Sequence, residues 1–309
     1  MKDSVRFEVE ILLSSNSVSR ISKLKRGIDI DFTESGYYIS AISDFGGSGN
    51  QIINELRNLS ESLIPGKNSL EVNYRIYCPE SLNLNLINKF GDIYVDDLRG
   101  EINISLSNGD MKINSISGVS RIELSFGSAN INHMSEATMV ASYADLDISK
   151  AEKLKIVSKS STVNIDDADV LVLDTRRDKY FIGRVWNSTL TSNFSEVWIE
   201  DMRCELRADM KFGDLTIDRV NTGFCKIDIL SEYADLNFFM EKNTAYAADV
   251  YAHKDAIVNL PLNIPSPGIK SIPRNEDEVH SYYKTSAREG ISPLIIRAPN
   301  KCYINIKEK

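Results

Sequence analysis

The 309-residue chain is poor in the residues that build metal and redox sites. It has four cysteines (Cys78, Cys204, Cys225 and Cys302) and three histidines, and it contains no CxxC pair. This spacing lacks the ligand pattern of a structural zinc site. No glycine-rich loop ending in Lys-Ser or Lys-Thr occurs, so the phosphate-binding P-loop is excluded. No sequence feature indicates a cofactor.

Positive charge and long apolar stretches are also scarce. The 36 Lys and Arg residues are outnumbered by 44 Asp and Glu residues, so the formal net charge is -8. An acidic balance argues against a nucleic-acid partner. No stretch approaches the roughly 18 consecutive apolar residues of a membrane helix, so no membrane span is expected. The first seven residues lack the apolar core of a signal peptide, so we expect a chain that is either cytosolic or missing its leader.

The chain does have a six-residue motif that recurs ten times. The template is Phe-Gly-Asp-Ile-Tyr-Val at 90–95, and the copies begin at residues 90, 108, 126, 143, 160, 177, 194, 212, 233 and 253. Its fourth and sixth positions are apolar in all ten copies. The residue four before each start is apolar in nine copies, and Asp249 is the exception. Alternation with a period of two indicates strands.

A repeat of 17–21 residues cannot bury its apolar face alone, so successive copies must stack. We therefore predict a mainly β protein, a parallel β-solenoid of about ten coils over residues 79–260. The second motif position is small in eight copies, which lets the backbone bend tightly. The first position is aromatic in six copies, which predicts rings stacked along one edge.

Residues 1–78 follow a different pattern and are predicted to form a small N-terminal α+β cap packed on the solenoid. The expected elements are a strand at 5–11, a helix at 18–24, a hairpin of Ile28–Phe32 with Tyr37–Ile42, and a helix at 52–63. Residues 261–309 contain six of the eight prolines and a final strand, Cys302–Ile306. They are predicted to form the C-terminal cap.

Asp occupies the third motif position in six copies, at Asp92, Asp110, Asp145, Asp214, Asp235 and Asp255. A stacked row of carboxylates could bind calcium. Each coil supplies a single such ligand, however, and the row is interrupted at Ser128, Thr162 and Lys179. We expect these aspartates to accept hydrogen bonds from backbone amides, with a metal site as the weaker alternative.

Cys204 and Cys225 each lie eight residues before a motif start, so they should be neighbours on successive coils. A disulfide is possible at that distance. In-register parallel strands are unfavourable for disulfide geometry, so two buried thiols are expected.

The fifth motif position should point outward, and it is polar in six copies. In the sixth and seventh copies it is Phe181 and Trp198. Trp186 is close in sequence, and Arg184 belongs to a local group of cations. Exposed aromatic rings on a flat sheet suit stacking on sugar rings or contact with a protein partner. These four residues form a candidate binding patch, and the alternative is that a flanking loop covers them.

The sequence Phe-Gly-Asp-Ile-Tyr-Val-Asp-Asp-Leu-Arg-Gly at 90–100, with its echo at 212–220, resembles a bacterial adhesin family of β-solenoid proteins. That family is a domain of unknown function, abundant in Bacteroides-type bacteria. The hairpin sequence at 28–32 resembles its N-terminal part. The resemblance implies a right-handed β-helix-like fold and a cell-envelope or extracellular location.

The leading expectation is a monomeric, non-catalytic adhesin or interaction protein that presents a repetitive β-sheet face to a glycan or a surface protein. One alternative is a polysaccharide-active β-helix enzyme, which needs two carboxylates at a defined separation. Asp145-Leu146-Asp147 and Asp166-Asp167 are acidic pairs, but no grouping singles out an acid and a base. An intracellular scaffold is the other alternative, favoured if Met1 is the true start.

Overall fold

The computed structural model describes residues 4–15, 18–44, 68–261, 268–271, 279–284 and 291–309. The chain divides into two compact units, Met1–Pro79 and Glu80–Lys309.

The first unit combines one helix with two small antiparallel sheets. β1 (Arg6–Ser15) pairs with β4 (Asn68–Tyr77), and β2 (Asp29–Glu34) pairs with β3 (Ile39–Asp44). α1 (Val18–Gly27) follows β1 in the chain. The predicted first strand, first helix and hairpin are confirmed. The predicted helix at 52–63 lies outside the described residues, and the packing of this unit as a cap stays a prediction.

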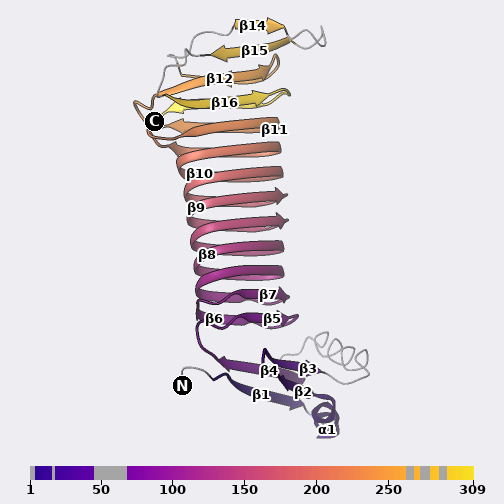
Figure 1. The fold of residues 1–309 in the computed structure, drawn as a ribbon. Coiled ribbons are helices and arrows are strands. Elements are labelled where there is room, and N and C mark those ends of the chain that lie inside the picture. The colour runs from indigo at the N-terminus through magenta and orange to yellow at the C-terminus, as the bar shows by residue number, and fades with distance from the viewer. Residues whose placement is uncertain (1–3, 16–17, 45–67, 262–267, 272–278, 285–290) are drawn as a thin grey trace. The chain divides into compact units, whose positions relative to one another are not determined.

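The second unit is a parallel β-solenoid of about nine turns (Figure 1). The strands that build its coils are β5 (Leu84–Asn88), β6 (Ile93–Leu98), β7 (Ile102–Ser107), β8 (Met111–Lys159), β9 (Thr162–Arg176), β10 (Lys179–Val220), β11 (Lys226–Met240), β12 (Tyr246–His253), β13 (Ile257–Asn259), β16 (Ser292–Ala298) and β17 (Tyr303–Glu308). β8 is 49 residues long because it continues through several coils, whose corners at Phe126 and Tyr143 are single left-handed residues.

The strand register confirms the predicted stacking of apolar positions. Leu86 pairs with Ile104, and Ile104 pairs with Ile122. Farther along, Ile156 pairs with Leu173, which pairs with Leu190. These columns fill the interior with branched side chains, and each fully buried one stabilises the fold by about 1.5–3 kcal/mol. The regular coil spacing therefore follows directly from the apolar period in the sequence.

The C-terminal part of the chain inserts one coil into the stack out of sequence order. β16 pairs in parallel with β11 on one side and with β12 on the other. β17 likewise lies between β11 and β13. Figure 1 shows this as a yellow strand, β16, between β11 and the orange β12. The coil of residues 292–308 thus separates two coils that are neighbours in the sequence.

This insertion corrects the register of the tenth motif copy. Val250 pairs with Ile296, which pairs with Ile229. Val250, and not Asp249, therefore stacks on the apolar residues that precede the other motif copies by four positions. Val258 pairs with Ile304, which pairs with Leu236 at a fourth motif position. The last copy therefore begins at Asp255 and not at His253.

The predicted C-terminal cap, 261–309, has two different parts. β14 (Gly268–Ser271) pairs with β15 (Val279–Lys284), and β15 pairs antiparallel with β12 at the end of the sheet. β16 and β17 are instead part of the coil stack. The final strand predicted at Cys302–Ile306 corresponds to β17.

Candidate functional site

The corner that begins each motif copy is built from a left-handed residue. The first motif position has φ between 52° and 64° in eight consecutive copies, at Asn108, Phe126, Tyr143, Ser160, Arg177, Phe194, Phe212 and Tyr233. None is glycine, although this conformation costs other residues roughly 1–2 kcal/mol. The tight bend was predicted at the second position. That position is small for another reason: a Cβ on Gly127 would lie 2.0 Å from the carbonyl oxygen of Gly109 in the preceding coil.

The aromatic side chains at this corner stack on one another, as predicted. Phe126 and Tyr143 have ring centroids 5.2 Å apart. Phe212 lies 4.6 Å from Phe194 and 5.3 Å from Tyr233, with nearly parallel rings. Stacked aromatic pairs contribute about 0.5–1.5 kcal/mol beyond burial, which offsets part of the backbone cost.

Several aspartates at the third position bond to the next coil. Asp92 Oδ1 accepts from the Asp110 amide at 2.9 Å, and Asp110 Oδ1 accepts from the Ser128 amide at 3.1 Å. Asp235 Oδ1 accepts from the Tyr303 amide at 2.7 Å. The prediction of hydrogen bonding to amides is confirmed for these aspartates, and the bonds run between coils.

The metal alternative gains no support from the geometry. Within the described ranges, no three His, Cys, Asp or Glu side chains are grouped as metal ligands. Asp145 and Asp214 pair with residues of adjacent coils, namely Thr162 and Asp235. Asp255 does not stack on the other aspartates, because it occupies the first motif position and not the third.

The predicted aromatic patch is exposed. Phe181 and Trp198 are each 47% exposed, and Trp186 is 53% exposed. The Glu196 amide donates to the Asp178 carbonyl at 3.0 Å, which aligns the two coils and places Phe181 and Trp198 at equivalent outward positions. Trp186 lies beyond a corner, because Gly183 and Arg184 interrupt the alternation of buried and outward residues. The patch therefore consists of Phe181 and Trp198 on one face, with Trp186 past the bend.

Arg184 belongs to a column of alternating charge rather than to an open cationic site. Its guanidinium donates to both carboxylate oxygens of Asp167, at 3.1 and 2.5 Å. The Arg184 hydrogen bond lowers the pKa of the Asp167 carboxyl below its usual range. Lys150 lies one coil before Asp167, and Asp201 lies one coil after Arg184. Asp201 in turn accepts a hydrogen bond from Arg219 at 2.8 Å. The positive charge expected near the aromatic patch is thus largely neutralised within the protein.

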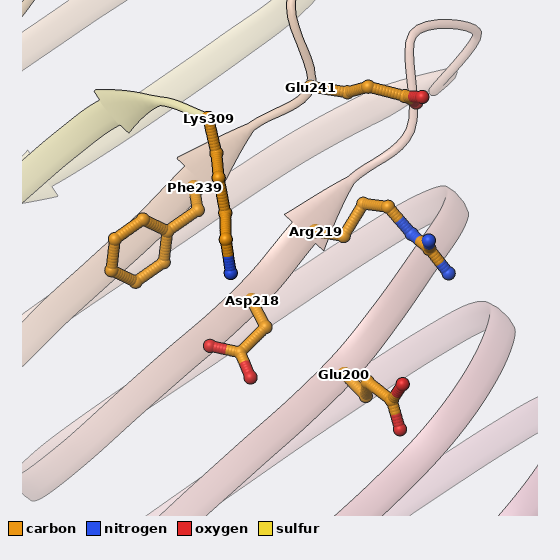
Figure 2. A pocket seen from close by; sticks show the side chains of 6 residues that line it. All are labelled: Glu200, Asp218, Arg219, Phe239, Glu241 and Lys309. Atoms are coloured by element: carbon orange, nitrogen blue, oxygen red, sulfur yellow. The ribbon is translucent and has the colours of Figure 1, made fainter.

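Figure 2 shows a surface pocket, whose volume is about 330 Å³. Its lining is Glu200, Asp218, Arg219, Phe239, Glu241 and Lys309. The Trp198 indole Nε1 donates to Asp218 Oδ2 at 2.8 Å, so Asp218 joins the patch to the pocket. In Figure 2 the Lys309 side chain runs alongside Phe239, and its Nζ lies 5.6 Å from the centre of the ring. Sequence reasoning missed this pocket, because Lys309 reaches it only through the inserted coil.

A buried polar network also escaped the sequence analysis. Asp178 is only 2% exposed, and its carboxylate accepts from the Ser158 hydroxyl and the Ser161 amide, each at 2.7 Å, and from the Arg176 amide at 2.9 Å. Burial raises the pKa of Asp178 above its ordinary value and raises that of neighbouring Tyr180 as well. The side chains of this network are buried, so we assign it a structural role.

Cys204 and Cys225 form a disulfide, which corrects the expectation of two thiols. Their Cα atoms are 4.6 Å apart, within the range that disulfides span. Cys225 directly precedes β11, after a turn closed by the Phe224 amide and the Asn221 carbonyl. The strict parallel-strand geometry assumed from the sequence therefore does not hold at this residue. Cys78 and Cys302 are free.

Three carboxylates, Glu200, Asp218 and Glu241, line the pocket of Figure 2, so the requirements of glycoside hydrolysis have to be considered there. A proton donor needs a raised pKa and a second carboxylate across the substrate. Asp214 has a raised pKa, caused by burial and by the nearby Asp235 and Glu196 charges. It lies outside the pocket of Figure 2. In the acidic pair Asp166–Asp167, the pKa of Asp167 is lowered, which is the opposite of what a proton donor needs.

Comparison with known proteins gives no assignment, because no family model, curated protein or solved structure matches the chain. In the parts of the chain that the structure describes, no helix is long and apolar enough to cross a membrane.

Proposed function

We propose that the protein is a non-catalytic interaction protein of the cell envelope or the extracellular space, an adhesin in the broad sense. It binds its partner through the outer sheet face that carries Phe181 and Trp198. One observation carries the proposal: two large aromatic side chains are half-exposed at equivalent positions of successive coils. Adjacent exposed apolar side chains, unlike scattered single ones, mark interaction surfaces.

The backbone beneath the patch supports a binding role. Phe181 pairs with Asn164 inside the continuous parallel ladder of β9 and β10. The Trp198 ring is additionally held by its hydrogen bond to Asp218. Side chains fixed in this way lose little conformational freedom on binding, which favours affinity.

The Cys204–Cys225 disulfide supports the proposed location. Disulfides persist in oxidising compartments such as the bacterial periplasm and cell surface, and they are rare in the reducing cytosol. The same argument weighs against an intracellular scaffold.

The interaction can be tested with fluorescently labelled protein applied to intact cells of the producing organism. The variant Phe181→Ala/Trp198→Ala should bind much more weakly than the parent protein. Phe126→Ala/Tyr143→Ala is the matched control, because it removes two exposed rings at a corner of earlier coils. Equal binding by parent and patch variant, or no binding by the parent, would refute the proposal.

The location needs its own measurement. Intact producing cells are treated with protease and then blotted for this protein and for a cytosolic marker. Loss of this protein while the marker persists is the expected result. Retention of both in the soluble cytoplasm would overturn the proposed location.

A further inference from the structure

Aromatic side chains are concentrated on one sheet face of the coils that span residues 177–239. Phe181 and Trp198 occupy the fifth motif position, the half-buried Phe239 occupies the seventh position of a later coil, and the edge carries the stack of Phe194, Phe212 and Tyr233. We call these six residues the aromatic face. The fifth position is Asn130, Asp147 and Asn164 in the three earlier coils and Thr216 and Asn237 in the two later coils, so among these coils only Phe181 and Trp198 are aromatic there. The rings therefore form a local surface and not a feature of every repeat.

The rings of the aromatic face alternate with carboxylates. Along β10 the outward residues are Phe194, Glu196, Trp198 and Glu200. In the next coil, Asp218 accepts from the Trp198 indole. A dry protein–protein contact would have to desolvate these carboxylates, which is costly without donors to pair with them. The surface therefore suits a partner that offers flat apolar patches bordered by hydroxyl donors.

The charge of this face further restricts the partner. Two of its cations have acidic partners, since Lys179 Nζ lies 3.4 Å from Glu196 and Arg219 donates to Asp201, and the Lys309 ammonium lies over the Phe239 ring. Burial raises the pKa of Asp214, and the nearby charges of Asp235 and Glu196 raise it further. Acidic side chains outnumber basic ones in the lining of the pocket, with Glu200, Asp218 and Glu241 against Arg219 and Lys309, and this balance disfavours polyanions.

The aromatic face also leaves space for a ligand along the coil axis, beside Phe181. Gly183 occupies the position equivalent to Glu200 one coil earlier, and it adds no side chain there. Its backbone fits closely, because a Cβ would lie 2.5 Å from the Asp166 carbonyl oxygen. Beyond Trp198 and Asp218, the face continues into the pocket of Figure 2, where Phe239 and Lys309 lie together.

We propose that the aromatic face binds a neutral glycan chain running along the coil axis. Sugar rings lie on Phe181 and Trp198, their hydroxyls donate to Glu200 and Asp218, and the end of the chain occupies the Phe239–Lys309 pocket. This inference rests on the proposed interaction function and names the class of its partner.

The test measures binding of the purified full chain to soluble polysaccharides by affinity electrophoresis and titration calorimetry. The neutral probes are laminarin, xyloglucan and galactomannan, and the acidic probes are polygalacturonate and alginate. We expect binding to at least one neutral probe and none to the acidic probes. Trp198→Ala and Phe239→Ala should each weaken it by about tenfold, the loss expected for one aromatic contact. Phe126→Ala/Tyr143→Ala is the control, and circular dichroism confirms that each variant is folded.

The outcomes separate this inference from the proposed function. Preference for the acidic probes, or neutral binding that is unchanged in Trp198→Ala, overturns the glycan assignment. So does a failure to bind every polysaccharide while labelled protein still binds intact cells through Phe181 and Trp198. That last result leaves the interaction function in place and points to a protein partner. Periodate treatment of the cells gives an independent check, because oxidation of surface glycans should abolish the binding.

Discussion

Ser158 donates a hydrogen bond of 2.7 Å to the Asp178 carboxylate of the adjacent coil, in the interior of the solenoid. The carboxylate also accepts from two backbone amides, yet burial still raises its pKa above the ordinary value of 3.8. A buried charge that is fully hydrogen-bonded is thus still more costly in the folded chain than in the unfolded one.

The first prediction concerns the pH dependence of stability. Because the folded pKa of Asp178 is raised, its contribution to stability is fully present below pH 3.8 and is lost as pH rises through the folded pKa. The stability advantage of the parent protein over Asp178→Asn should therefore shrink as pH increases above 3.8. Urea unfolding of both proteins from pH 3.5 to 7 would measure this difference.

Asp167→Asn provides the matched control with the opposite sign. Arg184 lowers the folded pKa of Asp167, so its contribution is present above pH 3.8 and is lost as pH falls through the folded pKa. The pair is exposed, so we expect at most about 1 kcal/mol. If the stability of the two variants relative to the parent changes with pH in the same direction, Asp178 is not a buried carboxyl with a raised pKa.

The second prediction concerns the left-handed corners. Arg177 adopts φ of 59° and occurs in a coil where the ring stack is interrupted. Arg177→Gly removes the cost of a left-handed non-glycine residue, but glycine also makes the unfolded chain more flexible. The two effects oppose one another, so the free energy of unfolding should change by less than about 1 kcal/mol. Phe212→Gly loses two stacked neighbours and should cost about 2–4 kcal/mol. Denaturant unfolding measures both variants. Equal losses would show that ring stacking does not stabilise the corners.

Much of this fold could be predicted from the sequence because each coil repeats the same inward positions. The column of Leu86, Ile104 and Ile122 follows directly from a spacing of 18 residues. Outward exposure of Phe181 and Trp198 follows from the same alternation. Periodicity reports pairing between successive copies only, however. It carries no information about a coil that is inserted from elsewhere in the chain.

The inserted coil does contain the motif. Lys301-Cys302-Tyr303-Ile304-Asn305-Ile306 has a small second residue and apolar fourth and sixth residues. It was missed because it does not keep the spacing of the preceding copies. The pocket at Phe239 was missed for the same reason, since Lys309 follows this coil. The Arg184–Asp167 pair could have been found by aligning the copies, because both residues lie at the eighth position from a motif start.

The third prediction concerns the disulfide. Cys204 and Cys225 are separated by 21 residues, and closing a loop of that length stabilises a fold by about 2–4 kcal/mol. Reduction, or Cys204→Ser/Cys225→Ser, should lower the melting temperature, whereas Cys78→Ser should leave it nearly unchanged. Thiol titration of the unfolded, unreduced protein should find two thiols, from Cys78 and Cys302. Four titratable thiols would refute the disulfide.

The last prediction tests the order of coils at the C-terminal end. Truncation after residue 291 removes β16 and β17, the parallel partners of β12 and β13. Because neighbouring coils stabilise one another, β12 and β13 should lose amide protection while β8 and β9 keep theirs. Hydrogen exchange read by mass spectrometry gives the protection of each segment. Lys307→Ala, an exposed change in β17, should leave the pattern intact. If the protection of β12 is unchanged in the truncated chain, its parallel pairing with β16 does not contribute to its stability, and the inserted coil would be contradicted.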